Sequence, residues 1–392
     1  MIIDMDTHIL PRDVYDHMEG PTADLRPRFE YDKDGLLVKW SFPGEYRVKG
    51  STPLPPPGAG GKHLGLSNMD VRLEEYQKLG IDKQLLLSQF SAIYFNYTLD
   101  PALAIQMAHS HNIAILNLIK KYPNELIGAA LVAMQDVPSA ISEMEWAKKN
   151  GFQAIAMDKV FPVREHQFSE TLGSHRELWP FFKRAEELGM PIVLHNVQHG
   201  HRISNMMIFQ RDGLDTLCPA EGQMSLASLC TSGLFDDFPN LKMVFTEAGS
   251  AFIKPLLDRL DAAFVKPPLN YEDEDATARF HRRVMPVSER LSAGKRLTSL
   301  EEYEVKNKKP VSEYFKENLF FTIETEEPEL PESIEMLGAT QFLFATDYPH
   351  DDPGGRMKYK DVQLLRDNPR IAEEAKDIIR STSAAAMLPA LT

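Results

Sequence analysis

Three short apolar segments of the chain end in side chains that can bind a metal ion. The segments are residues 1–6 (MIIDMD), 190–194 (MPIVL) and 342–346 (FLFAT). The polar residues at their ends are Asp6 with His8, His195, and Asp347. A carboxylate at the end of a hydrophobic strand is costly to bury without a partner. Because three strands end in this way, the sequence predicts one shared metal site. For each strand end considered by itself, the alternative is that the polar residue begins a loop exposed to solvent.

The spacing of Asp6 and His8 supports this prediction. They are two residues apart on an extended segment, so both side chains project to the same side. One divalent ion can then be bound from that side, while His195 and Asp347 close the site and leave positions open for water or substrate. Asp347 can also act as a general acid or base. For His8 and His195, the alternative is a core histidine with its hydrogen bonds satisfied.

Other polar residues near these strand ends are candidates for catalysis or substrate binding. Glu247 follows the apolar segment 241–246 and could transfer a proton, or it could cap the helix after it. His350, in TDYPH, could orient a ligand or lie on a turn. The loop after residue 194 carries candidate substrate-binding side chains, for which a plain surface loop is the alternative. These residues are His199, His201 and Arg202.

The composition of the chain limits the classes of protein to which it can belong. The chain has 392 residues, is 43% hydrophobic and carries a formal net charge of -14, which argues against a nucleic-acid partner and an anionic membrane surface. No apolar run approaches the roughly 18 residues of a membrane span. The two cysteines, Cys218 and Cys230, form no close pair, so a reducing compartment is expected. The N-terminus lacks a signal pattern, and we expect a cytoplasmic protein.

Eight short apolar segments are predicted to be strands, and helices are predicted between nearly all of them. The predicted strands are residues 1–6, 83–89, 126–132, 152–157, 191–194, 241–246, 319–323 and 342–346. The predicted helices are residues 70–79, 101–121, 137–150, 175–188, 221–234, 251–264, 332–337 and 371–387. Continuous apolar strands are typical of a parallel sheet covered on both faces. We predict an α/β fold, a single (β/α)8 TIM barrel over residues 1–392, rather than a doubly wound sheet.

Two insertions interrupt this alternation. Residues 20–67, after the first strand, contain a predicted β-hairpin around the turn DKDG and a Pro- and Gly-rich loop, PLPPPGAGG. Residues 266–316, before the seventh strand, are charged and lack strong periodicity. Either insertion could be a lid or an oligomer contact, and a homodimer is expected.

With these motifs in order, the chain resembles the amidohydrolase superfamily, in particular the branch that contains the aminocarboxymuconate-semialdehyde and γ-resorcylate decarboxylases. The resemblance covers nearly the whole chain and includes DxH at residues 6–8, His195, residues 238–261 (FPNLKMVFTEAGSAFIKPLLDRLD) and TDYPH. It places an arginine that binds the substrate carboxylate or an interface near Arg259. It also implies one bound divalent ion, Zn²⁺ or Mn²⁺. The implied ligands are Asp6, His8, His195 and Asp347.

Two residues depart from the pattern of this branch. Asp6 stands where amidohydrolases carry His and several decarboxylases carry Glu or His. A carboxylate there favours Mn²⁺ or Mg²⁺ without excluding Zn²⁺. Glu247 stands where the decarboxylases usually have a His. Glu247 could take over proton transfer or only order its loop.

The resemblance implies a metal-dependent lyase that decarboxylates a carboxylated aromatic or muconate-like acid without oxidation, with Asp347 protonating the carbon that loses CO₂. The alternative is a hydrolase in which a metal-activated water attacks an amide, lactone or C–C bond. The absent strand-six His counts against the lyase, and Asp6 counts against ordinary amide hydrolysis. A barrel that binds a partner without catalysis is a third reading, which the four ligand types disfavour.

Overall fold

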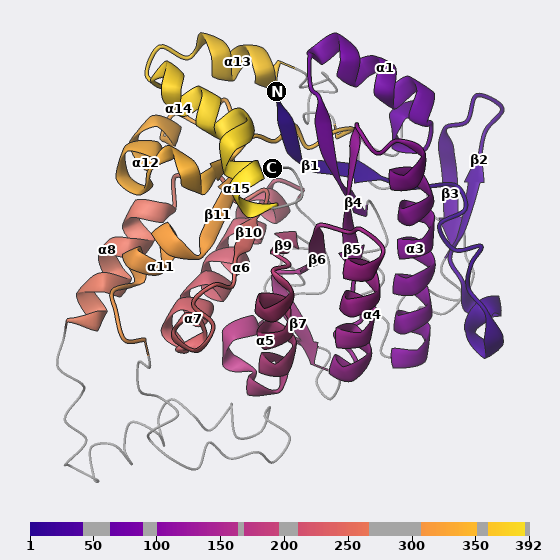
Figure 1. Ribbon diagram of the computed structural model, residues 1–392, viewed down its shortest axis with the longest axis horizontal. Coiled ribbons are helices and arrows are strands. Elements are labelled where there is room, and N and C mark those ends of the chain that lie inside the picture. The colour runs from indigo at the N-terminus through magenta and orange to yellow at the C-terminus, as the bar shows by residue number, and fades with distance from the viewer. Residues whose placement is uncertain are drawn as a thin grey trace.

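Strands arranged in parallel form the centre of the computed structural model, which describes residues 1–41, 63–88, 100–163, 168–195, 211–265, 307–350 and 360–388 (Figure 1). Within these residues the main sheet has eight strands, in the order β1-β4-β5-β6-β9-β10-β11-β12. They are β1 (Ile3–Ile9), β4 (Lys83–Ser88), β5 (Leu126–Leu131), β6 (Ala154–Asp158), β9 (Ile192–His195), β10 (Met243–Phe245), β11 (Leu319–Thr322) and β12 (Phe342–Leu343). The predicted strands and the (β/α)8 barrel are therefore confirmed.

Contacts between the first strand and the segment around β12 bring the two edges of the sheet together. The backbone N–H of Met5 donates to the carbonyl of Phe344 at 2.9 Å, and that of His8 donates to the carbonyl of Tyr348 at 2.6 Å. Thr7 and Tyr348 form a parallel bridge. A sheet whose edges meet in this way is a barrel, and the carboxyl ends of its strands share one rim.

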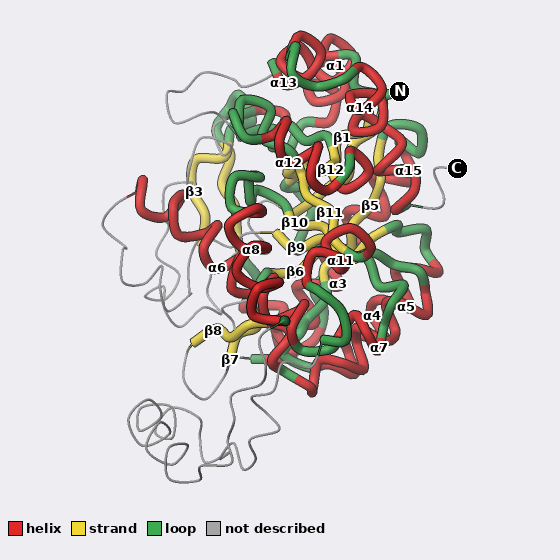
Figure 2. Tube along the Cα trace, turned by 90° about the vertical axis from the view of Figure 1, so that its left-hand side faces the viewer, coloured by secondary structure: helices red, strands yellow, loops and turns green. Residues whose placement is uncertain are grey.

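Helices surround the strands of the main sheet, such as β9, β10 and β11, which lie in the middle of Figure 2 (yellow). The helices that correspond to those predicted between the strands are α1 (Met69–Leu79), α3 (Pro101–Lys121), α4 (Val137–Lys149), α5 (Trp179–Leu188), α6 (Arg211–Thr231), α8 (Ile253–Phe264) and α12 (Leu330–Leu337). Side-chain caps fix the starts of α3 and α4, where the carboxylates of Asp100 and Asp136 accept from backbone N–H groups in the first turn. Gly80 and Gly189 end α1 and α5 in the left-handed conformation.

Several boundaries differ from the sequence prediction. Helix α5 begins at Trp179 rather than residue 175, because short 3₁₀ turns precede it and Pro180 stands in its first turn. The helix predicted over residues 371–387 is divided into α14 (Glu373–Asp377), a π-helix (Ile378–Thr382) and α15 (Ser383–Met387). The prediction also missed several short elements. These are α7 (Leu234–Asp237), α11 (Val311–Glu317), α13 (Asp361–Asp367), β7 (Val160–Val163) and β8 (Phe168–Thr171).

The hairpin in the first insertion is present as β2 (Arg28–Tyr31) and β3 (Leu37–Ser41), which pair antiparallel. Its turn is held by Asp32, whose carboxylate accepts from two backbone N–H groups, and by Gly35 in the left-handed conformation. The Pro- and Gly-rich loop and residues 266–306 of the second insertion lie outside the described residues. The lid and dimer roles of both insertions stay predictions.

Residues of one strand alternate between two apolar clusters. Ile192 and Leu194 of β9 belong to a cluster that includes the helix residue Phe181. Val193, between them, belongs to a second cluster with Val244 and other strand residues. The period of two places one set against the helices and the other inside the barrel. The interior is therefore a packed core, and the chemistry must take place at its rim.

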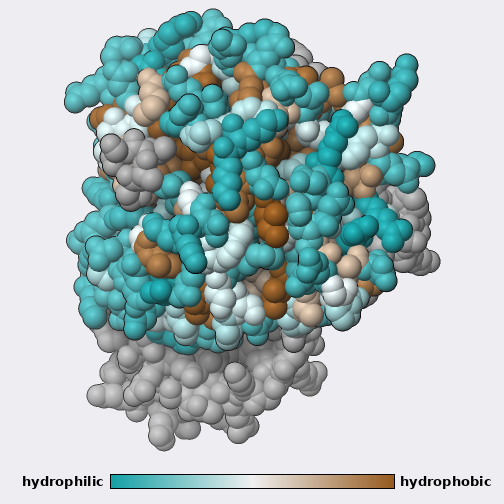
Figure 3. Space-filling model, turned by 45° about the vertical axis from the view of Figure 1, so that its right-hand side comes forward, coloured by the Kyte–Doolittle hydropathy of each residue, from teal (hydrophilic) through white to brown (hydrophobic). Residues whose placement is uncertain are grey.

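Hydrophilic residues cover most of the face in Figure 3, with hydrophobic residues in small separate areas. Among the described residues, no helix is long and apolar enough to cross a bilayer.

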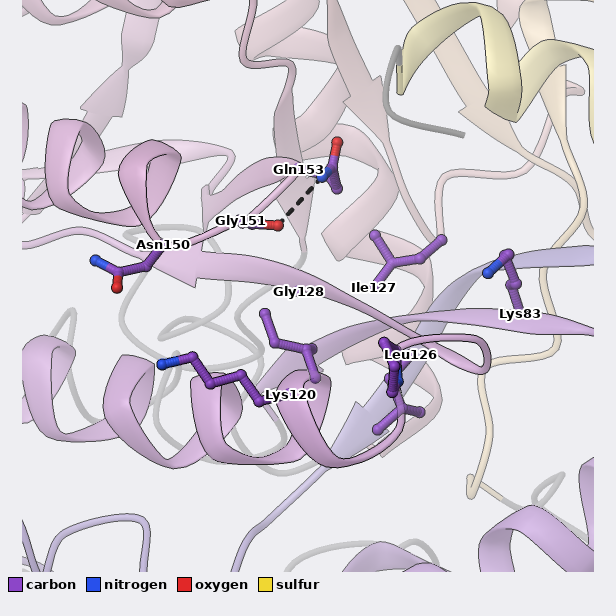
Figure 4. Close-up of a pocket in the computed structure, with 10 residues that line it drawn as sticks. Lys83, Lys120, Leu126, Ile127, Gly128, Asn150, Gly151 and Gln153 are labelled. Carbon is purple, nitrogen blue, oxygen red and sulfur yellow. Dashed lines mark hydrogen bonds between the residues drawn. The ribbon is translucent and has the colours of Figure 1, made fainter. Parts of the chain in front are cut away.

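A hollow of about 450 Å³ opens at the amino ends of the strands (Figure 4). Lys83 and Leu126, the first residues of β4 and β5, line it together with Gly128 and Gln153. The side-chain amide of Gln153 donates to the carbonyl of Gly151 at 3.1 Å. This hollow lies at the end of the barrel opposite to the predicted metal ligands.

Candidate metal centre

The side chains predicted to bind a metal meet at the carboxyl ends of the strands. The Nε2 atom of His8 lies 3.0 Å from Oδ1 of Asp347, 3.2 Å from Nε2 of His195 and 3.5 Å from Oδ1 of Asp6. Glu247 joins them: its Oε1 atom lies 3.2 Å from Nε2 of His195 and 3.6 Å from that of His8. From the sequence, Glu247 is expected to transfer a proton, cap a helix or order its loop, and not to bind the metal, so its place among these donor atoms is a new finding.

Two overlapping sets of donor atoms have the spacing of a metal site, with all atoms of a set within 4.8 Å of one another. The first set is Asp6, His8, His195 and Glu247. The second set is His8, Glu247, Asp347 and His350. His350 enters through a 2.7 Å contact between its Nδ1 atom and Oδ1 of Asp347, and its ring stacks on that of His8 with centroids 4.3 Å apart.

Strand β1 extends further than the sequence prediction. It continues to Ile9, so Asp6 and His8 lie within the strand rather than at or beyond its end. The register between β1 and β4 shifts between Asp4 and Thr7. Both side chains are almost completely buried and approach each other to 3.5 Å, as expected for residues two apart on one strand.

An unusual backbone conformation places Glu247 and Asp347. Their φ angles are 47° and 55°, and among the described residues they are the ones other than glycine with positive φ. This conformation costs roughly 1 kcal/mol or more for a residue with a side chain. Hydrogen bonds hold it: the N–H of Glu247 donates to the hydroxyl of Thr322 at 3.2 Å, and that of Asp347 donates to the carbonyl of Asp6 at 3.0 Å. Strain of this kind is concentrated at functional sites.

The charges of the cluster depend strongly on one another. Burial raises the pKa of Asp6 well above its usual value, and the charges of Glu247 and Asp347 raise it further, against the effect of His8. Burial lowers the pKa of His8, but hydrogen bonds to Asp347 and Glu247 and the nearby carboxylate charges raise it well above its usual value. Burial also raises the pKa of Glu247, but His195 and His8 together hold it well below its usual value.

A buried polar atom of this cluster indicates that its residues fit a metal ion. In the described part of the chain, Oδ1 of Asp6 has no hydrogen-bond partner. A buried acceptor without a partner costs about 1–3 kcal/mol, and more when it is charged. A divalent cation between the carboxylates and imidazoles would satisfy the Asp6 oxygen and balance the excess negative charge. Oxygen and imidazole donors suit Zn²⁺ and Mn²⁺.

Of the four predicted substrate-binding residues, the structure describes Arg259, which is not in the sets of donor atoms. His199, His201 and Arg202 lie outside the described residues. Arg259 is exposed on α8. The roles of all four residues stay predictions.

Sequence reasoning missed Asp4, which connects β1 to the segment before Asp347. The carboxylate of Asp4 accepts from the backbone N–H of Thr346 at 3.1 Å, the hydroxyl of Thr346 at 2.5 Å and the hydroxyl of Tyr76 at 2.9 Å. Burial raises the pKa of Asp4 to about 6, against these hydrogen bonds. The available signal was an acidic residue inside an otherwise apolar strand segment, MIIDMD.

The fold and the strand-end cluster define a metal-binding barrel of the amidohydrolase type. The amidohydrolase family model matches residues 3–390, and the chain belongs to that family. A curated relative, 2-amino-3-carboxymuconate-6-semialdehyde decarboxylase of Dictyostelium discoideum, is 25% identical over 189 residues. The matched part is 47% of this chain and 48% of the relative, so the chain matches about half of the relative's length.

Solved structures of similar fold include several decarboxylases. The 2,6-dihydroxybenzoate decarboxylase from Rhizobium has a TM-score of 0.68 at 19% identity, covering 100% of this chain and 99% of its own. A dihydroxybenzoic acid decarboxylase from Polaromonas sp. JS666, with bound manganese and the inhibitor 2-nitroresorcinol, has a TM-score of 0.67 at 20% identity, covering 100% and 97%. The 5-carboxyvanillate decarboxylase from Sphingomonas paucimobilis has a TM-score of 0.67 at 22% identity, covering 99% and 98%. At these identities the likeness shows the fold.

Proposed function

We propose that this protein is a metal-dependent carboxy-lyase, which removes CO₂ from a small carboxylated aromatic or muconate-like acid without oxidation. The observation that carries the proposal is the meeting of three carboxylates and the His195 imidazole around Nε2 of His8, at the rim where barrels of this class bind substrate. The named activities of the curated relative and of the similar structures support it, since each is a decarboxylase of an acid of this kind.

The proposal includes one divalent ion, Mn²⁺ or Zn²⁺. Manganese in the Polaromonas structure supports the first choice. When bound, the ion would supply the positive charge that holds the substrate carboxylate and a neighbouring oxygen. The residues proposed to hold the ion are Asp6, His8, His195 and Asp347, with Glu247 beside them.

The proton chemistry is assigned to Asp347 and His350. Decarboxylation leaves an electron pair on carbon, and this carbon must receive one proton as CO₂ departs. Asp347 and His350 share a 2.7 Å hydrogen bond, so a proton can be held between them and delivered from Asp347. Glu247, 3.2 Å from His195, keeps the imidazole oriented and is available for proton transfer.

The test is incubation of the Mn²⁺-loaded protein with 2,6-dihydroxybenzoate, 5-carboxyvanillate and a carboxymuconate semialdehyde in H₂¹⁸O, followed by mass spectrometry of the organic product. The expected result is loss of CO₂, no ¹⁸O in the organic product and, in D₂O, one deuterium at the carbon that lost the carboxylate. The folded Asp347→Asn variant should lose activity by about 10³-fold, in line with removal of a general acid. Incorporation of ¹⁸O into the organic product would instead identify a hydrolase that uses activated water.

The remaining expectations belong to the same proposal. Contacts to the substrate from residues 199–202 and from Arg259, a homodimer formed through one of the two insertions, and a cytoplasmic location rest on the sequence interpretation. Light scattering on the purified full chain measures the oligomeric state directly, and a monomeric mass would remove the dimer from the proposal.

A further inference from the structure

A completely buried arginine lies behind the candidate metal centre. Arg72, on α1, has none of its surface exposed and is among the largest fully buried side chains of the described residues. A buried guanidinium is rare because desolvation of the charge is costly. The groups that contact Arg72 therefore indicate the role of this buried side chain.

The first partner of Arg72 is the backbone of His8. The Nη1 atom of Arg72 donates to the carbonyl of His8 at 2.6 Å and to that of Gly65 at 3.3 Å. Its Nε atom donates to the side-chain carbonyl of Gln84 on β4, which fixes the plane of the guanidinium. Arg72 thus contacts the main chain of a proposed metal ligand, whose donor atom is on the imidazole.

The second partner is Tyr348, the residue that follows Asp347. The guanidinium carbon of Arg72 lies 4.7 Å from the centre of the Tyr348 ring, within the range of a cation–π contact. The hydroxyl of Tyr348 donates to Oε2 of Glu75 at 2.5 Å, and Glu75 is one turn from Arg72 on α1. One face of α1 therefore contacts both segments that carry proposed metal ligands.

The packing around Tyr348 leaves no space for another atom. A Cβ added at Gly65 would lie 1.7 Å from the hydroxyl oxygen of Tyr348 and 2.7 Å from its Cζ. Only glycine lets the turn at residues 64–66 pass this close to the ring. Contacts with the turn, with α1 and with β1 thus fix the position of Tyr348, and with it the position of the neighbouring Asp347.

Within the ranges that the structure describes, no carboxylate forms an ion pair with Arg72. Among the described residues its contacts are carbonyl oxygens and aromatic rings, and its Nη2 atom has no hydrogen bond. Beyond His8 lie the carboxylates of Asp6, Glu247 and Asp347. Arg72 therefore acts on these donors through the positions of the His8 backbone and the Tyr348 ring, and not through an ion pair with a carboxylate.

We propose that Arg72 is a positioning residue for the metal centre. Together with Tyr348 and Glu75, it holds the His8 backbone and the start of the TDYPH segment so that their donor atoms are in place before the metal binds. The inference rests on the metal-binding part of the proposed function and names a residue outside the ligand set. Residues that support metal ligands in this way affect metal affinity by about 10- to 100-fold.

The experiment measures Mn²⁺ binding by titration calorimetry on metal-stripped full-length protein, without substrate. Arg72→Met keeps most of the side-chain volume and should weaken Mn²⁺ binding by about 10- to 100-fold. Arg72→Lys, which keeps the charge and one donor but loses the planar fork, should recover part of that loss. Tyr348→Phe, which keeps the ring but loses the bond to Glu75, should weaken binding by a smaller factor.

Lys376→Met is the matched control. Lys376 is also almost completely buried, and its Nζ atom donates to the carbonyl of Arg366 at 2.7 Å in the C-terminal helices. This variant should lose stability but keep wild-type Mn²⁺ affinity. A purely structural role for Arg72 predicts the same behaviour for Arg72→Met.

Wild-type Mn²⁺ affinity in folded Arg72→Met would overturn the inference. If Arg72→Met does not fold, unchanged affinity in both Arg72→Lys and Tyr348→Phe would overturn it equally. Neither result affects the proposed decarboxylation, which is measured on wild-type protein. Conversely, a wild-type protein that binds Mn²⁺ but decarboxylates none of the acids would contradict the proposed reaction and leave the role of Arg72 standing.

Discussion

Both ends of the barrel use positive φ, but at the carboxyl ends residues other than glycine also adopt it. At the amino ends, Gly80, Gly151 and Gly189 adopt positive φ where α1, α4 and α5 give way to the next strands. At the carboxyl ends, Glu247 and Asp347 adopt positive φ although both carry side chains. Glycine enters this region at almost no cost, whereas other residues lose roughly 1–2 kcal/mol.

The distribution of buried charge shows the same contrast. Asp6 and His8 are buried at the carboxyl end with polar atoms that no described residue satisfies. At the amino end, Lys83 is half-buried and donates to the carbonyl of Asn124 at 2.6 Å. The residues at the amino end of the barrel therefore contribute to stability, whereas strain and buried charge occur at the carboxyl end, where they serve function.

Removal of a proposed ligand is expected to have the largest effect. His195→Ala should weaken Mn²⁺ binding by more than about 100-fold, beyond the loss typical of a supporting residue, because it removes a donor atom itself. Elemental analysis of dialysed protein measures the metal content, and circular dichroism checks the fold. Unchanged metal content in the folded variant would remove His195 from the ligand set and weaken the contrast between the two ends.

An acidic residue near the carboxyl ends of the strands should reduce the stability of the folded protein at neutral pH. Asp361 accepts a 2.8 Å hydrogen bond from Thr325, and burial raises its pKa from 3.8 to about 7, against that hydrogen bond. Below about pH 4 the carboxyl is protonated in both the folded and the unfolded chain. As pH rises from about 4 to 7, the unfolded chain loses this proton first, so the free energy of unfolding falls.

Asp361→Asn should remove this dependence. The variant keeps an acceptor for Thr325 and should be more stable than the wild type at pH 8 by roughly 2 kcal/mol, with little difference at pH 4. Urea unfolding at the two pH values measures the difference. Equal stability of the two proteins at pH 8 would show that the buried carboxyl carries no such cost.

The smallest effect is expected at the amino end. Gly151 has a φ of 92°, and a Cβ added there meets no atom within 4 Å. Gly151→Ala therefore tests the backbone alone and should cost about 1 kcal/mol of unfolding free energy without changing Mn²⁺ affinity. Changed metal affinity in this variant would indicate that the two ends are coupled.

The strands and most helices could be predicted because their signals are local. Runs such as LIGAAL and capping residues such as Asp100 act within a few residues of each other. The start of α5 also had a local signal, Pro180 in its first turn, which the prediction did not use. The π-helix near the C-terminus had none, because the carbonyl of Ile379 within it accepts a hydrogen bond from the distant N–H of Phe344. Arg72 was missed for a similar reason: an arginine in an amphipathic helix is usually solvated.

The sequence by itself determined that polar donors follow apolar strands at several places, and from this alone a barrel with a metal site at its rim could be expected. The tertiary structure decided which donors approach one another. Glu247 stands among the proposed ligands because its left-handed backbone turns the side chain there, and the bonds between β1 and the segment after β12 set Asp347 beside His8. Contacts between residues hundreds of positions apart depend on barrel closure, which no local pattern encodes.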